Sequence, residues 1–98
     1  MKVSALVTDL MDRSRISAAL PGATFMLTPD ADVVIVDLGR GIDQVVTVRN
    51  SHPDARIVAY GPHVDDESMA AARSAGADVV VPRSRFFRDP AQIVGMPA

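Results

Sequence analysis

Cysteine and tryptophan are absent from this sequence of 98 residues, and its aromatic side chains are limited to three phenylalanines and one tyrosine. Without cysteine the chain can form no disulfide, no thiolate-zinc site, no iron–sulfur cluster and no cysteine nucleophile. No apolar run reaches the roughly eighteen residues that a membrane-spanning helix needs. Asp9 also interrupts the first apolar run too early for a signal peptide. We therefore expect a soluble, cytoplasmic protein without a membrane partner.

An excess of charge of one sign is missing as well. Ten basic and twelve acidic side chains are spread along the chain and give a net charge of −2, which argues against nucleic acid as a partner. The hydrophobic fraction is 48% and the charged fraction is 22%, the composition of a folded globular protein. This length and composition predict a single domain over residues 1–98.

Apolar segments rich in β-branched residues alternate with segments of helical period. The predicted strands cover residues 3–8, 23–27, 33–36, 56–60 and 79–81, and the predicted helices cover 12–20, 42–50, 65 or 66 to 74, and 84–95 with a break at Asp89-Pro90. In the second helix, Ile42, Val45, Val46 and Arg49 are predicted to lie on one stripe. Such alternation predicts an α/β protein: a flavodoxin-like three-layer sandwich with a mostly parallel, five-stranded sheet in the order 2-1-3-4-5.

One connection is too short for this fold. Only residues 29–32 separate the second and third predicted strands, whereas a parallel crossover usually takes a dozen residues or more and contains a helix. We expect a short second strand with the helix between strands two and three missing. An antiparallel second strand, or one that pairs with another chain, would satisfy the same constraint. Apolar surface left uncovered near these strands would favour a protein partner or a homodimer.

Three segments, taken in order and spacing, resemble the receiver domain of bacterial response regulators, which is CheY-like in fold. The resemblance covers about residues 3–86 and is carried by the segments Asp32–Leu38, Pro53–Ala59 and Ala75–Val81. The first segment resembles the family's third strand, which ends in the aspartate that accepts a phosphoryl group. The resemblance therefore implies a module of two-component signalling.

The resemblance also assigns roles to single residues. Asp37 matches the phosphoacceptor, and the backbone carbonyl at Gly39 matches a ligand of Mg²⁺, a cation that prefers oxygen ligands. The family's acidic pair is replaced by Thr8-Asp9, which lacks one metal-binding carboxylate unless Asp12 supplies it.

Two further positions complete the comparison with the receiver family. Gly61 stands where the family has a hydroxyl, and Arg83 stands where it has a phosphate-contacting lysine, with the charge kept and the geometry changed. These departures favour a degenerate receiver, or pseudo-receiver.

Each of these residues also has a purely structural interpretation. Asp9 and Asp37 would cap the helices that follow them, and Arg83 would form an ordinary salt bridge with Asp37. Phe86 and Phe87 would pack on the sheet; if they are exposed instead, they would form an interface with a partner.

Our leading hypothesis is a stand-alone, degenerate receiver-like domain that is a non-catalytic regulatory or protein-interaction module, with no certain cofactor. One alternative is a genuine phosphoacceptor in which Asp37 is phosphorylated with Mg²⁺ held by Asp9, Asp12 and Gly39. A second alternative is a small-molecule or nucleotide-binding domain at the same edge of the sheet.

Overall fold

The computed structural model describes residues 1–62 and 66–95. Its sheet is parallel throughout and has four strands in the order β1-β2-β3-β4. The strands are β1 (Val3–Leu6), β2 (Val33–Asp37), β3 (Arg56–Gly61) and β4 (Val79–Pro82). Because all four run in the same direction, their carboxyl ends share one edge of the sheet, where Asp37 ends β2.

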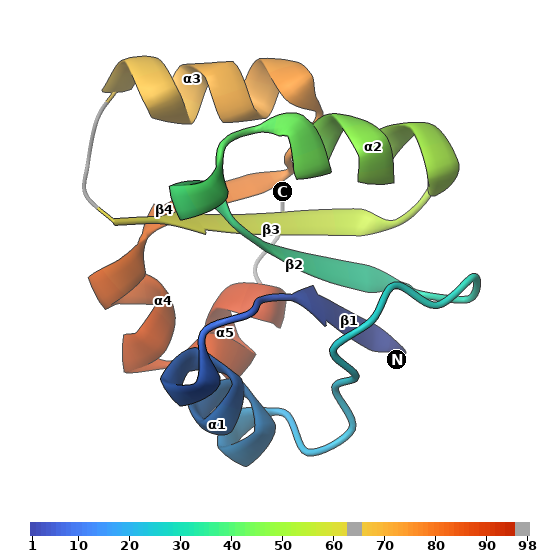
Figure 1. Cartoon of the computed structure of the whole chain (residues 1–98), viewed down its shortest axis with the longest axis vertical. Coiled ribbons are helices and arrows are strands. Elements are labelled where there is room, and N and C mark those ends of the chain that lie inside the picture. Colours follow the sequence, from blue (N-terminus) through green and yellow to red (C-terminus); the bar gives the residue numbers. More distant parts are fainter. Residues whose placement is uncertain (63–65, 96–98) are drawn as a thin grey trace.

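Helices cover both faces of this sheet (Figure 1). One face carries α1 (Leu10–Ala19), α4 (Arg83–Arg88) and α5 (Pro90–Gly95), and the other carries α2 (Asp43–Ser51) and α3 (Asp66–Ala75). A 3₁₀ turn, η1 (Leu38–Arg40), joins β2 to α2. The predicted three-layer α/β sandwich is confirmed, as is the break in the last helix. In the described part of the chain, no helix is both long and apolar enough to cross a bilayer.

The predicted strand at residues 23–27 is wrong, so the described sheet has four strands rather than five. Only Thr24 pairs with β1, in a parallel bridge to Ser4 in which the amide of Ala5 donates to the carbonyl of Thr24 at 2.8 Å. The chain then leaves the sheet edge, and no further residue pairs there. As expected, no helix lies between residues 23 and 33.

Residues 25–29 cover the part of the sheet that was expected to lie bare. The amide of Thr28 donates to the hydroxyl of Ser4 at 3.3 Å, and the carbonyl of Thr28 accepts from Nε2 of His52 at 2.9 Å. Leu27 packs against the apolar cluster beneath α2 and α3, and Ser4 is fully buried. The expectation of uncovered apolar sheet is therefore wrong at this place, and the homodimer predicted from it remains a prediction.

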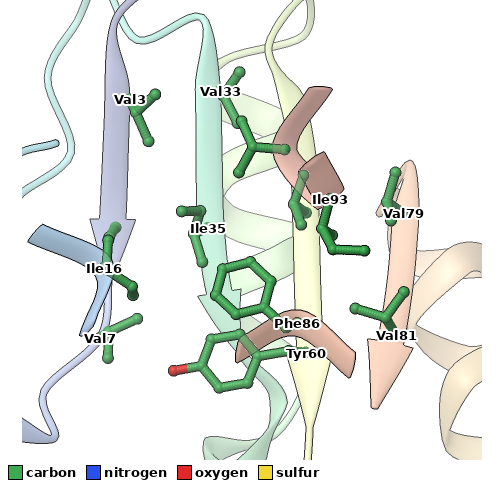
Figure 2. Packing of buried hydrophobic residues seen from close by; sticks show 13 residues of the cluster. Val3, Val7, Ile16, Val33, Ile35, Tyr60, Val79, Val81, Phe86 and Ile93 are labelled. Carbon is green, nitrogen blue, oxygen red and sulfur yellow. The ribbon is translucent and has the colours of Figure 1, made fainter. Parts of the chain in front are cut away.

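Burial of the central strands on both faces separates two apolar cores. Residues 33–36 are between 0% and 2% exposed, as their unbroken β-branched run predicts. Val33 and Ile35 face α1, α4 and α5 together with Tyr60 and Phe86, the cluster shown in Figure 2. Val34 and Val36 face α2 and α3.

The buried stripe of α2 differs from the predicted one. Val45 and Val48 are fully buried, whereas Ile42 and Val46 are 38% and 41% exposed. The two buried valines lie three residues apart and therefore on one side of the helix. The prediction was right for Val45, but it placed Ile42 and Val46 on the buried side in place of Val48, because all four residues are apolar.

At the amino edge of the sheet, Arg49 at the end of α2 binds the ends of several elements. Its guanidinium donates to the carbonyls of Gly76, Pro53 and Ala55 at 2.8–3.1 Å and pairs with Asp78 at 2.8 Å. Gly76 follows α3 with a φ of 121° and lies against the Arg49 side chain. The glycine both permits the backbone turn and makes room for the guanidinium.

We predict that Gly76→Ala destabilises the protein by about 1–3 kcal/mol, because alanine disfavours this φ. Its Cβ would also lie 2.8 Å from Cγ of Arg49. Gly22→Ala is the matched control, since no atom lies within 4 Å of a Cβ at that position and its φ is not positive. Urea unfolding of both variants measures the difference. Equal stability of the two variants would contradict the role assigned to Gly76.

Candidate functional site

Asp37 lies at the carboxyl edge of the sheet, at the end of β2, and is partly exposed. Its Oδ1 accepts the backbone N–H of Gly39 at 2.8 Å and so caps the η1 turn. The amide of Gly39 thus faces the carboxylate. This confirms the structural interpretation of Asp37 as a cap. Its Oδ1 already accepts the hydrogen bond from Gly39.

Asp9 is the N-cap of α1. Its Oδ1 accepts the backbone N–H of Asp12 at 3.0 Å, and the residue is exposed. A carboxylate in this position satisfies a free amide of the first helical turn. The capping interpretation of Asp9 is therefore confirmed.

Asp12 is fully buried, although it is charged and lies in the first turn of α1. Both of its oxygens accept hydrogen bonds from the guanidinium of Arg83, and Oδ2 also accepts the hydroxyl of Tyr60 at 3.0 Å. The hydrogen bonds from Arg83 hold the pKa of the Asp12 carboxyl below its usual value of 3.8, against the opposing effect of burial. Asp12 therefore stays ionised, and its charge is balanced within the protein.

Tyr60 connects this ion pair to the apolar core. Its ring stacks on Phe86 with a centroid distance of 4.8 Å and meets the edge of Phe87 at 5.1 Å. Figure 2 shows the ring of Phe86 next to that of Tyr60, with the Tyr60 hydroxyl at the border of the cluster. Burial raises the pKa of the Tyr60 hydroxyl above its ordinary value, and the nearby carboxylates of Asp37 and Asp12 raise it further. The hydroxyl is therefore a stable hydrogen-bond donor at neutral pH.

Arg83 binds Asp12, and the predicted salt bridge to Asp37 is wrong. The guanidinium also lies 4.9 Å from the ring centroid of Phe87 and 5.9 Å from that of Tyr60. The hydrogen bonds to Asp12 raise the pKa of Arg83, and the charge of Asp37 adds to this rise. Asp37 therefore acts on the ion pair through space without bonding to it.

A second arginine connects the loops at the carboxyl edge. Arg40, at the end of η1, donates from Nη1 to the hydroxyl of Thr8 at 3.0 Å. Thr8 follows β1 and precedes the Asp9 cap. The bond brings a positive charge between the two loops that carry Asp9 and Asp37.

The side chains present do not fit the Mg²⁺ that the receiver resemblance implies. Both carboxylate oxygens of Asp12 already accept hydrogen bonds from Arg83, and Oδ2 also accepts one from Tyr60. Among residues 1–62 and 66–95, no three acidic or histidine side chains are grouped so that they could hold a metal ion. Asp9 and Asp37 are thus not joined by Asp12 into the predicted metal site.

The surface cavities do not favour binding of a small molecule at Asp37 either, because neither of the two described below is lined by this residue. A cavity of about 170 Å³ adjoins Gly39 and Gly61 and is lined mainly by apolar side chains, among them Leu38, Met69 and Val80. It is smaller than the 300 Å³ or more that is typical of small-molecule sites. A larger hollow of about 640 Å³ lies at the opposite edge, around Arg49 and Arg73.

The aromatic pair after β4 is mostly core. Phe86 is fully buried and Phe87 is half-buried, so packing is confirmed for Phe86, and an interface formed by its side chain is wrong. Tyr60 belongs to the site although no sequence motif predicted it. A signal was present, because a lone tyrosine in an apolar strand must bring its hydroxyl to a partner.

Comparison with known proteins identifies the fold. No protein-family profile and no curated protein sequence matches the chain. Among solved structures, a response regulator from Thermotoga maritima superimposes with a TM-score of 0.72 at 16% identity, covering 97% of this chain and 98% of the other. The BeF₃-activated receiver domain of DrrB gives a TM-score of 0.74 at 19% identity, with 97% of each chain covered. The fold is that of a response-regulator receiver domain.

A third structure with this receiver fold carries ligands. It is a response regulator protein from Burkholderia pseudomallei with a phosphorylated aspartic acid, a calcium ion and citrate. It superimposes with a TM-score of 0.68 at 17% identity, covering 85% of this chain and 60% of the other.

We predict that the two partners of the ion pair contribute unequally to stability. Arg83→Met is expected to destabilise the protein by about 3–5 kcal/mol, because it leaves the Asp12 charge buried without its partner. Asp12→Leu is expected to destabilise it less, since the Arg83 side chain is 37% exposed and can reach water. Urea unfolding at neutral pH measures both effects.

The double variant Asp12→Leu/Arg83→Met completes this cycle. It is expected to be more stable than Arg83→Met alone, because no buried charge remains. Effects of the two single substitutions that simply add would contradict a direct pairing of Asp12 with Arg83.

The raised pKa of Tyr60 predicts the alkaline behaviour of the protein. Its contribution to stability is fully present below pH 10.0, the usual pKa of the group, and is lost as the pH rises above that value. Since the chain has one tyrosine and no tryptophan, phenolate absorbance reports this residue alone. We expect phenolate to form together with loss of the circular dichroism signal. Ionisation near pH 10 in a folded protein would contradict the buried hydroxyl.

Proposed function

We propose that this chain is a receiver-like regulatory domain that acts by binding another protein, without phosphotransfer at Asp37 and without enzyme activity. The Arg83–Asp12 pair carries the proposal. It neutralises the one buried carboxylate of the site, and the described residues group no further acidic side chains that could hold a metal ion. A phosphoryl transfer that relies on a divalent cation would lack its ligands here.

The rival function is phosphorylation of Asp37, and one observation favours it. Asp37 ends a strand at the carboxyl edge and is partly exposed, in a fold shared with a response regulator that contains a phosphorylated aspartic acid. Arg83 and Arg40 would supply positive charge near such a group. The two functions make opposite predictions about a phosphoryl donor.

We predict that the protein gains no phosphoryl group when it is incubated with phosphoramidate and Mg²⁺. Intact-mass spectrometry measures this, with a phosphorylatable receiver domain as positive control and Asp37→Asn as negative control. Amide chemical shifts are expected to stay unchanged when Mg²⁺ and beryllofluoride are added. A phosphoryl adduct that disappears in Asp37→Asn would overturn the proposal and establish the rival function.

A further inference from the structure

Basic residues are concentrated on two neighbouring helices. Helices α1 and α4 lie on the same face of the sheet (Figure 1), and the guanidinium of Arg15 on α1 lies 5.7 Å from the ring centroid of Phe87 on α4. The two helices hold five of the ten basic side chains and only one carboxylate, Asp12, which gives them a net charge of +4 in a chain of net charge −2. The five basic residues are Arg13, Arg15, Arg83, Arg85 and Arg88.

Three of these arginines keep their charge available. Arg83 is neutralised by Asp12, and the Nε of Arg13 donates to the carbonyl of Val7 at 2.6 Å. Arg15, Arg85 and Arg88 are exposed, and none of them has a carboxylate at salt-bridge distance within residues 1–62 and 66–95. Arg15 also lies within cation–π distance of the Phe87 ring, and this contact would reduce the conformational entropy that its side chain loses on binding.

Exposed apolar side chains stand at the start of α1, the helix that carries Arg15. Leu10 is 77% exposed and Met11 is 66% exposed, which places both among the most exposed large hydrophobic residues of the described chain. Met11 precedes Arg15 by four residues, so the two share one side of the helix. We call the set Leu10, Met11, Arg15, Arg85 and Arg88 the α1–α4 surface.

We infer that the α1–α4 surface binds an acidic segment of a partner protein that also carries apolar side chains. This inference rests on the proposed function and specifies the partner's chemistry. Carboxylates would pair with the three available guanidinium groups, and an apolar side chain would cover Leu10 and Met11. The two exposed apolar residues favour protein over nucleic acid, and so does the small number of available charges, because nucleic acid affinity grows with the number of phosphates neutralised.

The test uses a fluorescein-labelled helical peptide in which glutamate and leucine residues alternate from turn to turn. A second peptide, with lysine in place of glutamate, is the control for charge. Fluorescence anisotropy measures the Kd, and amide chemical shifts of the protein map the contact. We expect shifts at Leu10, Met11 and α4. The triple variant Arg15→Glu/Arg85→Glu/Arg88→Glu is expected to bind the glutamate peptide at least about tenfold more weakly and to gain binding of the lysine peptide.

A matched pair of single variants separates this surface from general charge attraction. Arg88→Glu and Arg73→Glu make the same substitution in the last turn of a helix, at exposed arginines without an ion pair to a described residue. Arg88→Glu is expected to raise the Kd several-fold and Arg73→Glu to leave it unchanged. Equal effects of the two variants, or shifts confined to α2 and α3, would overturn the inference.

Duplex DNA serves as the competing probe, and tighter binding of DNA than of the peptide would also overturn the inference. The phosphoramidate experiment is independent of these measurements, because it contains no peptide. Failure of the inference about the surface would appear in the peptide measurements, whereas failure of the proposed function would appear as a phosphoryl adduct.

Discussion

The bidentate pairing of Arg83 with Asp12, completed by the Tyr60 hydroxyl, is the constraint on which the carboxyl edge of this protein depends. It joins α1, the end of β3 and the start of α4 through one fully buried carboxylate. A buried charge is tolerated only with its partners in place, so the three elements must meet in this arrangement. Once Arg83 is fixed, the residues that follow it carry Phe86 into the core and place Phe87 beside Tyr60. The aromatic cluster and the ion pair therefore support one another.

The same pairing shapes what the site can do. In the receiver family that this chain resembles, carboxylates at the ends of strands hold a divalent cation. Here an arginine of the chain itself occupies the buried carboxylate, and the two remaining aspartates cap the elements that follow them. Positive charge at this edge is covalently part of the protein and does not depend on an ion. Such an edge agrees with the binding function proposed above, and three exposed arginines, Arg15, Arg85 and Arg88, lie on the two helices that the ion pair connects.

Much of the architecture followed from the sequence. Unbroken β-branched runs predicted the buried central strands, and Asp89-Pro90 predicted the break in the last helix correctly. Other predictions were wrong because they concerned partners that lie far apart in the sequence. The charge of Asp37 raises the pKa of Arg83, yet Arg83 forms its hydrogen bonds with Asp12, which is 71 residues away in the sequence. Thr24 lies where a strand was predicted, but it forms only a single bridge, to Ser4, before the chain leaves the sheet edge, and the amide of Thr28 then bonds to the Ser4 hydroxyl.

The amino-acid sequence by itself determined the α/β class, the missing crossover helix and the position of Asp37 at a strand end. These properties follow from local periodicity and from the reach of a short connection. Only the tertiary structure decided that Asp12 is the buried carboxylate, that Tyr60 completes its hydrogen bonds, and that residues 25–29 cover the sheet in place of a helix. The physical reason is that charge pairing and burial depend on which distant side chains come together in space, and one-dimensional patterns do not contain these distances.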